Sequence, residues 1–334
     1  MKYQPPYTIT SKIIHLIAQI SENIGRLTVL EEIQENLKLR KANRIRTIQG
    51  SLAIEGNTLS TEQITAILNG KTVIAPPKEV QEVRNAIKAY EAFQQWQPSQ
   101  EADLLQAHQV LMTGLIDEVG QYRHGGVGVM SGDRVVHMAP PANQINRLMA
   151  DLLGWLNDSD VHPLIQSSVF HYEFEFIHPF ADGNGRMGRL WQTLILSRWN
   201  PIFANIPVES LIYQNQKAYY EALQASTDRT DSAVFIEFIL QMILDAMLSS
   251  NETAQNGDHA AAQASVQVND QVQRLISVME QGEYSLAELM QLLGLTHRAT
   301  FQKNYLNTAI ELGLIERTIP EKPKSPKQKY RLKK

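Results

Sequence analysis

The chain has 334 residues, of which 43 % are hydrophobic and 20 % charged, and a formal net charge of −4; this length allows about two domains with packed cores. It contains no cysteine, which excludes disulfides, zinc–thiolate sites and a cysteine nucleophile, and it shows neither a secretory signal nor an uncharged apolar run of about 18 residues. We therefore expect a soluble, cytoplasmic protein with no membrane partner.

The first part of the chain is predicted to be helical. Apolar residues recur every three or four positions from Ser11 to Leu39, which indicates one or two amphipathic helices. Another helix is expected from about Lys41 to Glu55, because Gly56-Asn57 is a typical C-cap. Ser51 lies four positions before Glu55 on the same helix face, so the carboxylate could reach an arginine across a cleft. Taken alone, a glutamate near a helix end is usually an exposed charge.

Further helices and one hairpin are expected before the central motif. The helices are residues 59–68, 79–96, 101–112, 143–157 and 163–177. Between Gly120 and Pro141 the sequence predicts two short strands around a turn. His108 is interpreted as structural, because a single histidine on an amphipathic helix is more often packed than catalytic.

Residues 178–189 form the most unusual stretch of the chain, with the sequence His-Pro-Phe-Ala-Asp-Gly-Asn-Gly-Arg-Met-Gly-Arg. A base, a carboxylate, an amide and two arginines lie close together there. Gly183 and Gly185 allow the backbone to approach a ligand, and the helix that follows begins with N–H groups that favour anions. The stretch therefore predicts a phosphate-binding loop.

Two other patterns overlap this stretch. Residues 183–188 also spell the dinucleotide fingerprint G-x-G-x-x-G, but the residues before them have helical spacing where that fingerprint requires a strand. His171, Glu175 and His178 have the spacing of metal ligands on one helix face. Pro179 disfavours helical geometry at His178, so the metal site is the weaker alternative.

The chain after the central motif completes the first domain and then becomes polar. Residues 211–225, which contain Tyr219-Tyr220, and residues 233–249 are expected to be helices. Residues 251–268 lack bulky apolar side chains until their end, which is typical of a linker.

Residues 269–334 are expected to form a second small domain of three helices and two strands. The third of these helices is predicted from His297 to Leu312. Residues 317–334 have a net charge of +7, against −11 for residues 1–316. This asymmetry favours an anionic partner for the C-terminal part, although a solvated tail explains it equally well.

The central stretch resembles the Fic family signature, His-Pro-Phe-x-[Asp/Glu]-Gly-Asn-Gly-Arg-x-x-Arg, and every specified position is present. The resemblance implies a mainly α fold, with a helical Fic domain over residues 41–250 that carries a β-hairpin flap. N-terminal helices within residues 1–40 would pack on this core. A winged helix-turn-helix domain is similarly implied over residues 269–334.

The resemblance implies the transfer of AMP from ATP to a Ser, Thr or Tyr hydroxyl of a target protein, with Mg²⁺ as cofactor. His178 would be the general base, and Asp182 would bind the metal ion together with ATP. The other implied ATP-binding residues are Gly183, Asn184, Gly185, Arg186, Met187, Gly188, Arg189, Tyr219 and Tyr220. Core packing explains the two tyrosines equally well. The flap residues that would hold the target are Val127, Gly128, Val129, Val135, Val136 and His137.

Residues 51–56 resemble the inhibitory motif [Ser/Thr]-x-x-x-Glu-[Gly/Asn] of class II Fic proteins, whose inhibitory helix is N-terminal to the catalytic core. This helix is expected at about residues 43–56. Ser51 and Glu55 would be its inhibitory residues, with Arg189 as the partner of the glutamate. The arginine would otherwise hold the γ-phosphate of ATP.

The resemblance leaves several functional alternatives open. The exposed face of the second domain's recognition helix would present His297, Arg298, Gln302 and Lys303 to DNA, although winged helices also bind proteins. The chain would then be a nucleotide-sensing DNA-binding regulator. Some Fic enzymes remove AMP or transfer another phosphate-linked group. Self-modification and a homodimer are also compatible with the sequence.

Overall fold

The computed structural model is mainly helical, as predicted, and falls into two units, Met1–Asn251 and Glu252–Lys334, called here the first unit and the second unit. The structure describes residues 3–33, 37–126, 128–131, 134–255, 272, 275–276, 278–279, 282–293, 295, 301–311, 314–319, 325 and 328–333. The description covers the backbone only for residues 27–33, 37–39, 128–131, 134–138, 251–255, 303–304, 308 and 311.

The first unit begins with helices that supply the predicted inhibitory segment. They are α1 (Ser11–Ile33), α2 (Leu37–Ile54), α3 (Thr61–Leu68), α4 (Pro77–Ala92), the 3₁₀ segment η1 (Phe93–Gln95) and α5 (Glu101–Met112). After α2 the chain turns at Gly56, whose φ is 89°. Its N–H bonds to the carbonyl of Ala53, and the N–H of Asn57 bonds to that of Leu52. This C-cap is the one expected from the sequence, and it fixes where Glu55 leaves the helix.

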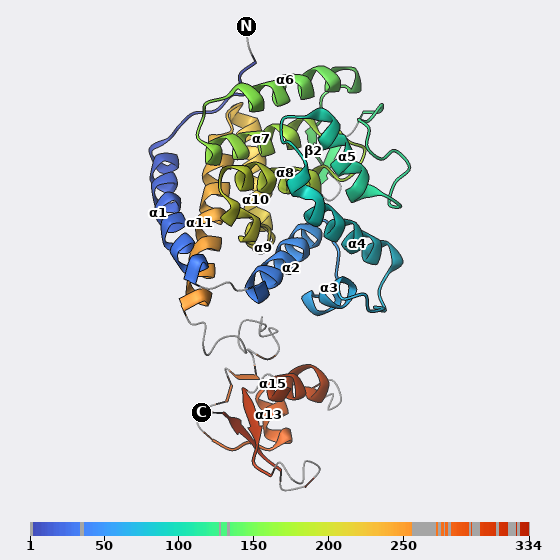
Figure 1. The fold of residues 1–334 in the computed structure, drawn as a ribbon. Coiled ribbons are helices and arrows are strands. Elements are labelled where there is room, and N and C mark those ends of the chain that lie inside the picture. The colour runs from blue at the N-terminus through green and yellow to red at the C-terminus, as the bar shows by residue number, and fades with distance from the viewer. Residues whose placement is uncertain are drawn as a thin grey trace. The chain divides into compact units, whose positions relative to one another are not determined.

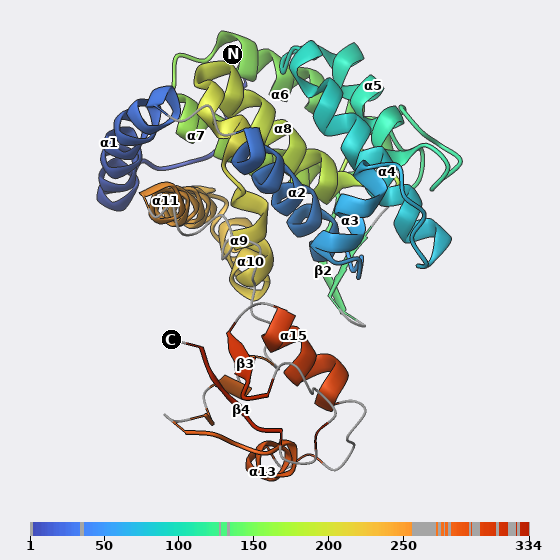
Figure 2. The ribbon, with the colours of Figure 1, turned by 60° about the horizontal axis from the view of Figure 1, so that its bottom comes forward.

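Helices α7 and α8 form the centre of the first unit (Figure 1). The second half of this unit contains η2 (Ala142–Gln144), α6 (Ile145–Asp158), α7 (Pro163–Ile177), α8 (Asn184–Trp199), η3 (Pro201–Asn205), α9 (Val208–Gln214), α10 (Gln216–Arg229) and α11 (Ala233–Gln255). In Figures 1 and 2, α1 and α11 lie on one side of this pair, and α4 and α5 lie on the other. The segment between α7 and α8 is therefore supported at both ends by buried helices.

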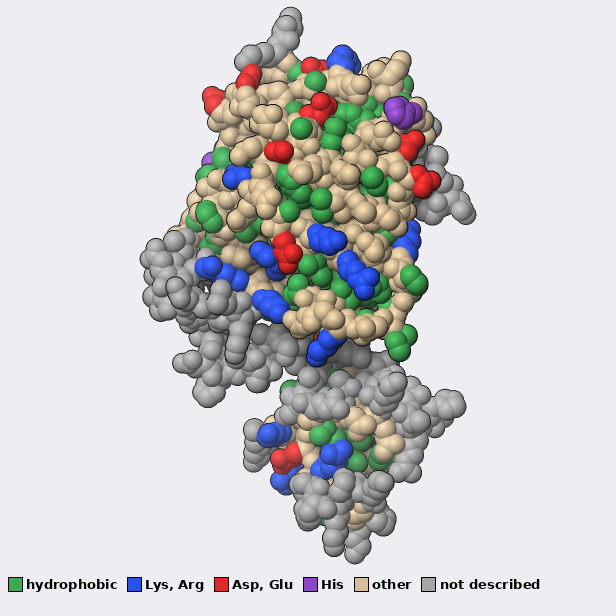
Figure 3. Space-filling model, turned by 45° about the vertical axis from the view of Figure 1, so that its right-hand side comes forward, with side chains coloured by type: hydrophobic (Ala, Val, Ile, Leu, Met, Phe, Trp, Pro, Cys, Tyr) green, Lys and Arg blue, Asp and Glu red, His purple; other side chains and the backbone are tan. Residues whose placement is uncertain are grey.

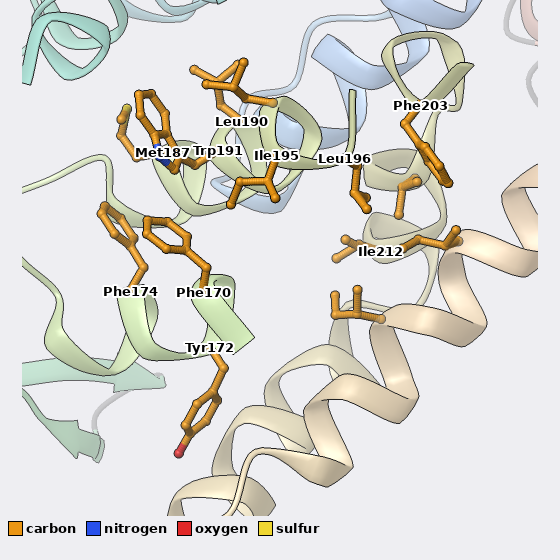
Figure 4. Packing of buried hydrophobic residues seen from close by; sticks show 14 of the residues in the cluster. Phe170, Tyr172, Phe174, Met187, Leu190, Trp191, Ile195, Leu196, Phe203 and Ile212 are labelled. Carbon is orange, nitrogen blue, oxygen red and sulfur yellow. The ribbon is translucent and has the colours of Figure 1, made fainter. Parts of the chain in front are cut away.

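Aromatic side chains fill the space between α7 and α8. Phe170 and Phe174 of α7 point toward Met187 and Trp191 of α8 (Figure 4), and all four side chains are fully buried. In each pair the two residues are four positions apart, so both lie on the same helix face. Burial of each such side chain contributes roughly 1.5–3 kcal/mol. This layer keeps the two helices, and the loop between them, in a fixed relation.

Helix α11 is long and apolar. Its segment Ala233–Ser250 has a mean hydropathy of 1.7, so it is long and apolar enough to cross a membrane by length and composition alone. Residues Phe235, Ile236, Ile239 and Leu240 are fully buried in the core of this unit. The core helix of a globular protein meets the same criteria, so the composition is explained by packing.

A β-hairpin lies between α5 and α6, where the sequence predicts one. Strand β1 (Gly128–Ser131) pairs antiparallel with β2 (Arg134–Met138), and the register shifts between Val129 and Met130. Such a bulge bends the strand and increases its twist.

The second unit has its own small apolar core, which includes Val272, Leu289 and Phe301. Its described elements are α13 (Leu286–Leu292), the π-helical segment η4 (Gln302–Leu306), α15 (Asn307–Glu311), β3 (Ile315–Arg317) and β4 (Tyr330–Leu332). Strands β3 and β4 pair antiparallel, in agreement with the two predicted strands. The helix predicted from His297 to Leu312 is instead π-helical over η4. Apolar spacing could not predict this difference, because it does not distinguish an i→i+5 turn from an α-turn.

Candidate active site

The loop that carries the predicted chemistry begins with a left-handed residue at the end of α7. His178 has φ 50° and ψ 60°, and its N–H bonds to the carbonyl of Phe174 at 2.9 Å. A non-glycine residue in this region costs roughly 1–2 kcal/mol, so the surrounding structure has to maintain it. Pro179 follows and cannot continue the helix hydrogen bonding. The chain therefore turns sharply at His178 and runs toward α8.

Asn184 closes the loop through its own side chain. Its Oδ1 accepts a hydrogen bond from the N–H of Phe180, and its Nδ2 donates to the carbonyl of the same residue, both at 2.9 Å. Asn184 is almost completely buried. The amide therefore shapes the loop, and its expected role in ATP binding stays a prediction.

Glycines permit close approaches at two points of the loop. Gly183 has φ 86°, and a Cβ there would lie 2.6 Å from the sulfur of Met112. A Cβ on Gly185 would collide with Glu55 and would lie 2.9 Å from Nη1 of Arg189. Gly185 thus leaves the space in which these two charged side chains meet.

His108 supports the loop from α5, although its sequence context indicates only a structural residue. Its Nδ1 accepts a hydrogen bond from the N–H of Gly120 at 3.0 Å, so Nε2 carries the proton and donates to the carbonyl of Asp182 at 3.0 Å. The ring stacks on Phe180 with a centroid distance of 3.7 Å. Burial lowers the pKa of His108 to about 4, so the imidazole is neutral at pH 7. This neutral tautomer fixes the backbone at Asp182.

Arg189 is held by the two residues predicted to be inhibitory. Its Nη2 lies 2.6 Å from Oε1 of Glu55 and 3.0 Å from the carbonyl oxygen of Ser51. Its Nε donates to Oγ of Ser51 at 3.2 Å. Burial alone would lower the pKa of Arg189, but the carboxylate of Glu55 raises it above its ordinary value. The guanidinium is therefore a buried cation neutralised by Glu55, directly after α2.

Arg186 is also paired with acidic side chains. Its Nη2 lies 3.0 Å from Oδ1 of Asp182, and its Nη1 lies 3.5 Å from Oε1 of Glu82 on α4. The second carboxylate oxygen of Glu82 accepts a hydrogen bond from Nδ2 of Asn57 at 2.8 Å. Glu82 was not expected from the sequence. It links the turn that follows Glu55 to Arg186.

Asp182 has the properties of a ligand for a hard cation. Its side chain is 47 % exposed, and Oδ1 accepts hydrogen bonds from Arg186 and from the N–H of Gly183. Mg²⁺ typically binds proteins through one or two carboxylates and completes its shell with phosphate and water oxygens. Asp182 fits such an ion.

The two tyrosines expected near the adenine lie in different environments. Tyr219 is 1 % exposed, and its hydroxyl lies 3.2 Å from Nε2 of His171 and 3.4 Å from Oε1 of Glu175. It packs on Phe235, so it belongs to the core. Tyr220 is 47 % exposed. Burial, and to a smaller extent the nearby charge of Glu55, raise the pKa of Tyr220.

Met187 and Gly188 face the core in the same way. Met187 is fully buried, and a Cβ on Gly188 would lie 2.9 Å from Cδ2 of His171. The side of α8 at these two residues therefore packs on α7, and their expected contact with ATP stays a prediction.

The alternative metal site on α7 is not supported. Nδ1 of His171 lies 2.6 Å from Oε1 of Gln192, and Nε2 bonds to the hydroxyl of Tyr219. Both ring nitrogens are therefore used within the protein. Among the residues that the structure describes, no group of three or more His, Cys, Asp or Glu side chains could hold a metal ion.

The remaining predicted residues are described only in part. Gly128 and Val129 lie in β1, and Val135, Val136 and His137 lie in β2, as backbone positions; Val127 lies outside the described residues. Among the predicted DNA contacts, His297 and Arg298 also lie outside them. Gln302 and the backbone of Lys303 lie in η4. The flap and DNA roles stay predictions.

The basic residues of α2 form a feature that was not expected from the sequence. Helix α2 contains five lysines and arginines and no acidic residue before Glu55. In Figure 3, lysine and arginine side chains gather over one part of the first unit. The cationic character of the chain is therefore not confined to its C-terminal residues.

The chain is similar to known proteins in sequence and in fold. Residues 98–196 match the Fic/DOC family, and residues 270–333 match the C-terminal domain of "Filamentation induced by cAMP protein Fic-like". The crystal structure of a Fic family protein from Desulfovibrio desulfuricans G20 is 54 % identical, with a TM-score of 0.72, and the match covers 99 % of this chain and 98 % of that one.

Similar proteins also include two named protein adenylyltransferase Fic. The one from Culex quinquefasciatus is 31 % identical over 60 % of this chain and 40 % of its own length. The one from Nematostella vectensis is 30 % identical over 61 % of this chain and 48 % of its own length. The chain thus spans less than half the length of these relatives.

Proposed function

Because this chain belongs to the Fic/DOC family, we propose that its first unit transfers AMP from ATP to a Ser, Thr or Tyr hydroxyl of a target protein and releases pyrophosphate. The distant relatives named protein adenylyltransferase support nucleotidyl transfer to proteins. The complete signature at residues 178–189 supports a triphosphate as the donor.

The observation that carries the proposal is the state of Arg189. This guanidinium is 2 % exposed, lies within α8 directly after the loop, and is neutralised by Glu55. A buried cation is stabilised by an anionic partner, and a phosphate oxygen can replace a carboxylate oxygen with similar hydrogen-bond geometry. Arg189 is thus an anion site that the protein fills with its own side chain.

The residues of the loop would divide the chemistry among them. His178 would accept the proton of the attacking hydroxyl, because an imidazole titrates near neutral pH. Arg186 and Arg189 would neutralise the leaving pyrophosphate with fixed, permanently charged forks. Free N–H groups at the start of α8 would stabilise charge on the phosphates. Asp182 would hold Mg²⁺, which when bound offsets the negative charge of the phosphates.

Glu55 would keep the enzyme inactive by occupying Arg189. The γ-phosphate then lacks its anchor, so the α-phosphorus is not aligned for in-line attack. If the competition is worth ~3 kcal/mol, the competent state is populated about a hundredfold less at ~1.4 kcal/mol per decade. Removal of the carboxylate should therefore raise the transfer rate.

Mass spectrometry of purified protein after incubation with ATP and Mg²⁺ tests this function. We expect added AMP on Glu55→Gly, little on the wild type and none on a Glu55→Gly/His178→Ala double variant. Glu62→Gly, at an exposed glutamate of α3, is the control and should behave as the wild type. Equal labelling of Glu55→Gly and Glu62→Gly would exclude the inhibitory role. Absence of AMP on every variant, with a candidate target also present, would contradict the proposed transfer.

A further inference from the structure

Arg123 lies where the predicted catalytic loop leaves α7. Its Nε donates to the carbonyl of His178 at 2.7 Å, and its Nη2 donates to that of Ile177 at 3.3 Å. Its backbone N–H donates to the carbonyl of Pro179 at 2.9 Å. A single residue thus binds three consecutive carbonyls, and the middle one belongs to the left-handed His178.

The same guanidinium also binds both ends of the hairpin. Nη1 donates to the carbonyl of Gly125, shortly before β1, and Nη2 donates to that of Pro140, shortly after β2, each at 2.7 Å. The two hairpin ends and the loop at His178 therefore share one hydrogen-bond donor group. A movement of either segment against the other would break at least one of these bonds.

Arg123 is 3 % exposed, and within the described part of the chain its guanidinium donates to carbonyl oxygens. Burying a cation without a carboxylate is costly, so its carbonyl dipoles have to be well oriented. Conversely, the four carbonyls that point to this guanidinium would repel one another if no cation lay between them. The arrangement stabilises the unusual backbone of His178 at the position that carries the imidazole.

We propose that Arg123 is a positioning residue that holds His178 in register with the hairpin, so that a hydroxyl presented by the hairpin reaches the imidazole. This inference rests on the proposed transfer of AMP. Arg123 touches neither nucleotide nor target and acts only through the backbone. Its contribution is the alignment of two segments that meet different substrates.

The fork of arginine is essential to this arrangement. Three of its nitrogens donate in a plane to four carbonyls, whereas lysine has one nitrogen with three donors and no planar fork. Arg123→Lys therefore keeps the charge and loses contacts on at least one side. The matched control is Arg198→Lys, since Nη2 of Arg198 donates to the carbonyls of Gln94 and Trp96 away from the loop.

The kinetic test uses the Glu55→Gly protein as its background. A misplacement of about 1 Å can cost a hundredfold in rate, so Arg123→Lys should lower kcat by about that factor. The KM for ATP should stay within about twofold, because the nucleotide contacts are untouched. Arg198→Lys should leave both constants unchanged. An unchanged kcat in Arg123→Lys, or a loss confined to KM for ATP, would overturn the inference.

Hydrogen exchange without nucleotide separates this inference from the proposed function. Three peptides should exchange faster in Arg123→Lys than in Arg198→Lys: the one with Gly125, the one with Pro140 and the one with residues 177–180. Faster exchange in only one of these segments, or in none, would overturn the positioning role of Arg123 even if AMP transfer is found. If Arg123→Lys does not fold, hydrogen exchange is measured on the wild type instead. The backbone amides of Arg123 and His178 should then exchange through one common opening, and independent opening would refute the positioning role of Arg123. If the Glu55→Gly protein transfers no AMP, the proposed function fails, and hydrogen exchange alone tests the positioning role of Arg123.

Discussion

Substitution of Gly50 should release Glu55 from Arg189 without touching either residue. Gly50 lies in α2, and a Cβ there would be 2.6 Å from the backbone nitrogen of Ser210 at the start of α9. Backbone atoms of Glu209 would lie 2.7 Å away. No side chain can rotate to relieve these contacts, so Gly50→Ala has to push α2 away from α9.

The displacement can be estimated from the same geometry. Ordinary contact begins at 3.4 Å, so the two helices have to separate by roughly 0.8 Å. Passed along α2 to Glu55, this shift would lengthen its 2.6 Å contact with Arg189 beyond the range of a charge-assisted hydrogen bond. Such a bond contributes roughly 1.5–3 kcal/mol. We expect AMP transfer to rise about tenfold or more, with a loss of about 1–3 kcal/mol in stability from overpacking.

Transfer rate and thermal unfolding should be measured together on this variant. Gly25→Ala in α1 is the matched control, because a Cβ at Gly25 meets nothing within 4 Å. It should leave the rate unchanged and raise stability slightly. Gly50→Ala should add nothing when Glu55 is already glycine, since both act on one contact. A lower melting temperature with no gain in transfer would refute the mechanical link between α2 packing and Arg189.

Two buried groups, His108 and Glu173, should change the stability of the protein with pH in opposite directions. The pKa of His108 is lowered to about 4, so its contribution to the free energy of unfolding is present above pH 6.5 and is lost as pH falls to 4. The difference between wild type and His108→Gln should shrink by about 3 kcal/mol over that range, and a constant difference would show that the imidazole does not titrate there. Burial raises the pKa of Glu173 to about 7 despite the hydrogen bond from Tyr3, so its contribution is present below pH 4.5 and is lost as pH rises through 7. Glu173→Gln should therefore gain up to about 3 kcal/mol relative to wild type between pH 4.5 and pH 8 in denaturant titrations, whereas a parallel pH profile would contradict the raised pKa.

The parts of the site that could be predicted are those whose residues are adjacent in the sequence. His178, Asp182 and the two arginines fall in one short stretch with a characteristic order, so the sequence alone identifies the loop. The helix end at His178 could also be predicted, because Pro179 excludes helical geometry before it. Most helices could be predicted from apolar spacing, and the resemblance to the Fic family implied the mainly helical fold.

The contacts that hold the loop in place could not be predicted, although His108 was interpreted as structural. Arg123 and His108 act on it across 55 and 74 positions of sequence, and their partners there are backbone carbonyls, which any residue provides. Glu82 likewise meets Arg186 only through the packing of α4. The tyrosine pair illustrates a missed but available signal. Adjacent residues on a helix point about 100° apart, so one buried and one exposed tyrosine could have been expected from the pair.

The contacts that shape the loop and those that occupy Arg189 come from separate residues. Arg123, His108 and Asn184 bind the loop backbone, whereas α2 supplies the ligands of Arg189. A lineage could therefore lose or strengthen the α2 contact by single substitutions without rebuilding the loop. For the engineer, the same separation provides a control element that can be tuned through α2 while the loop of α8 is left intact.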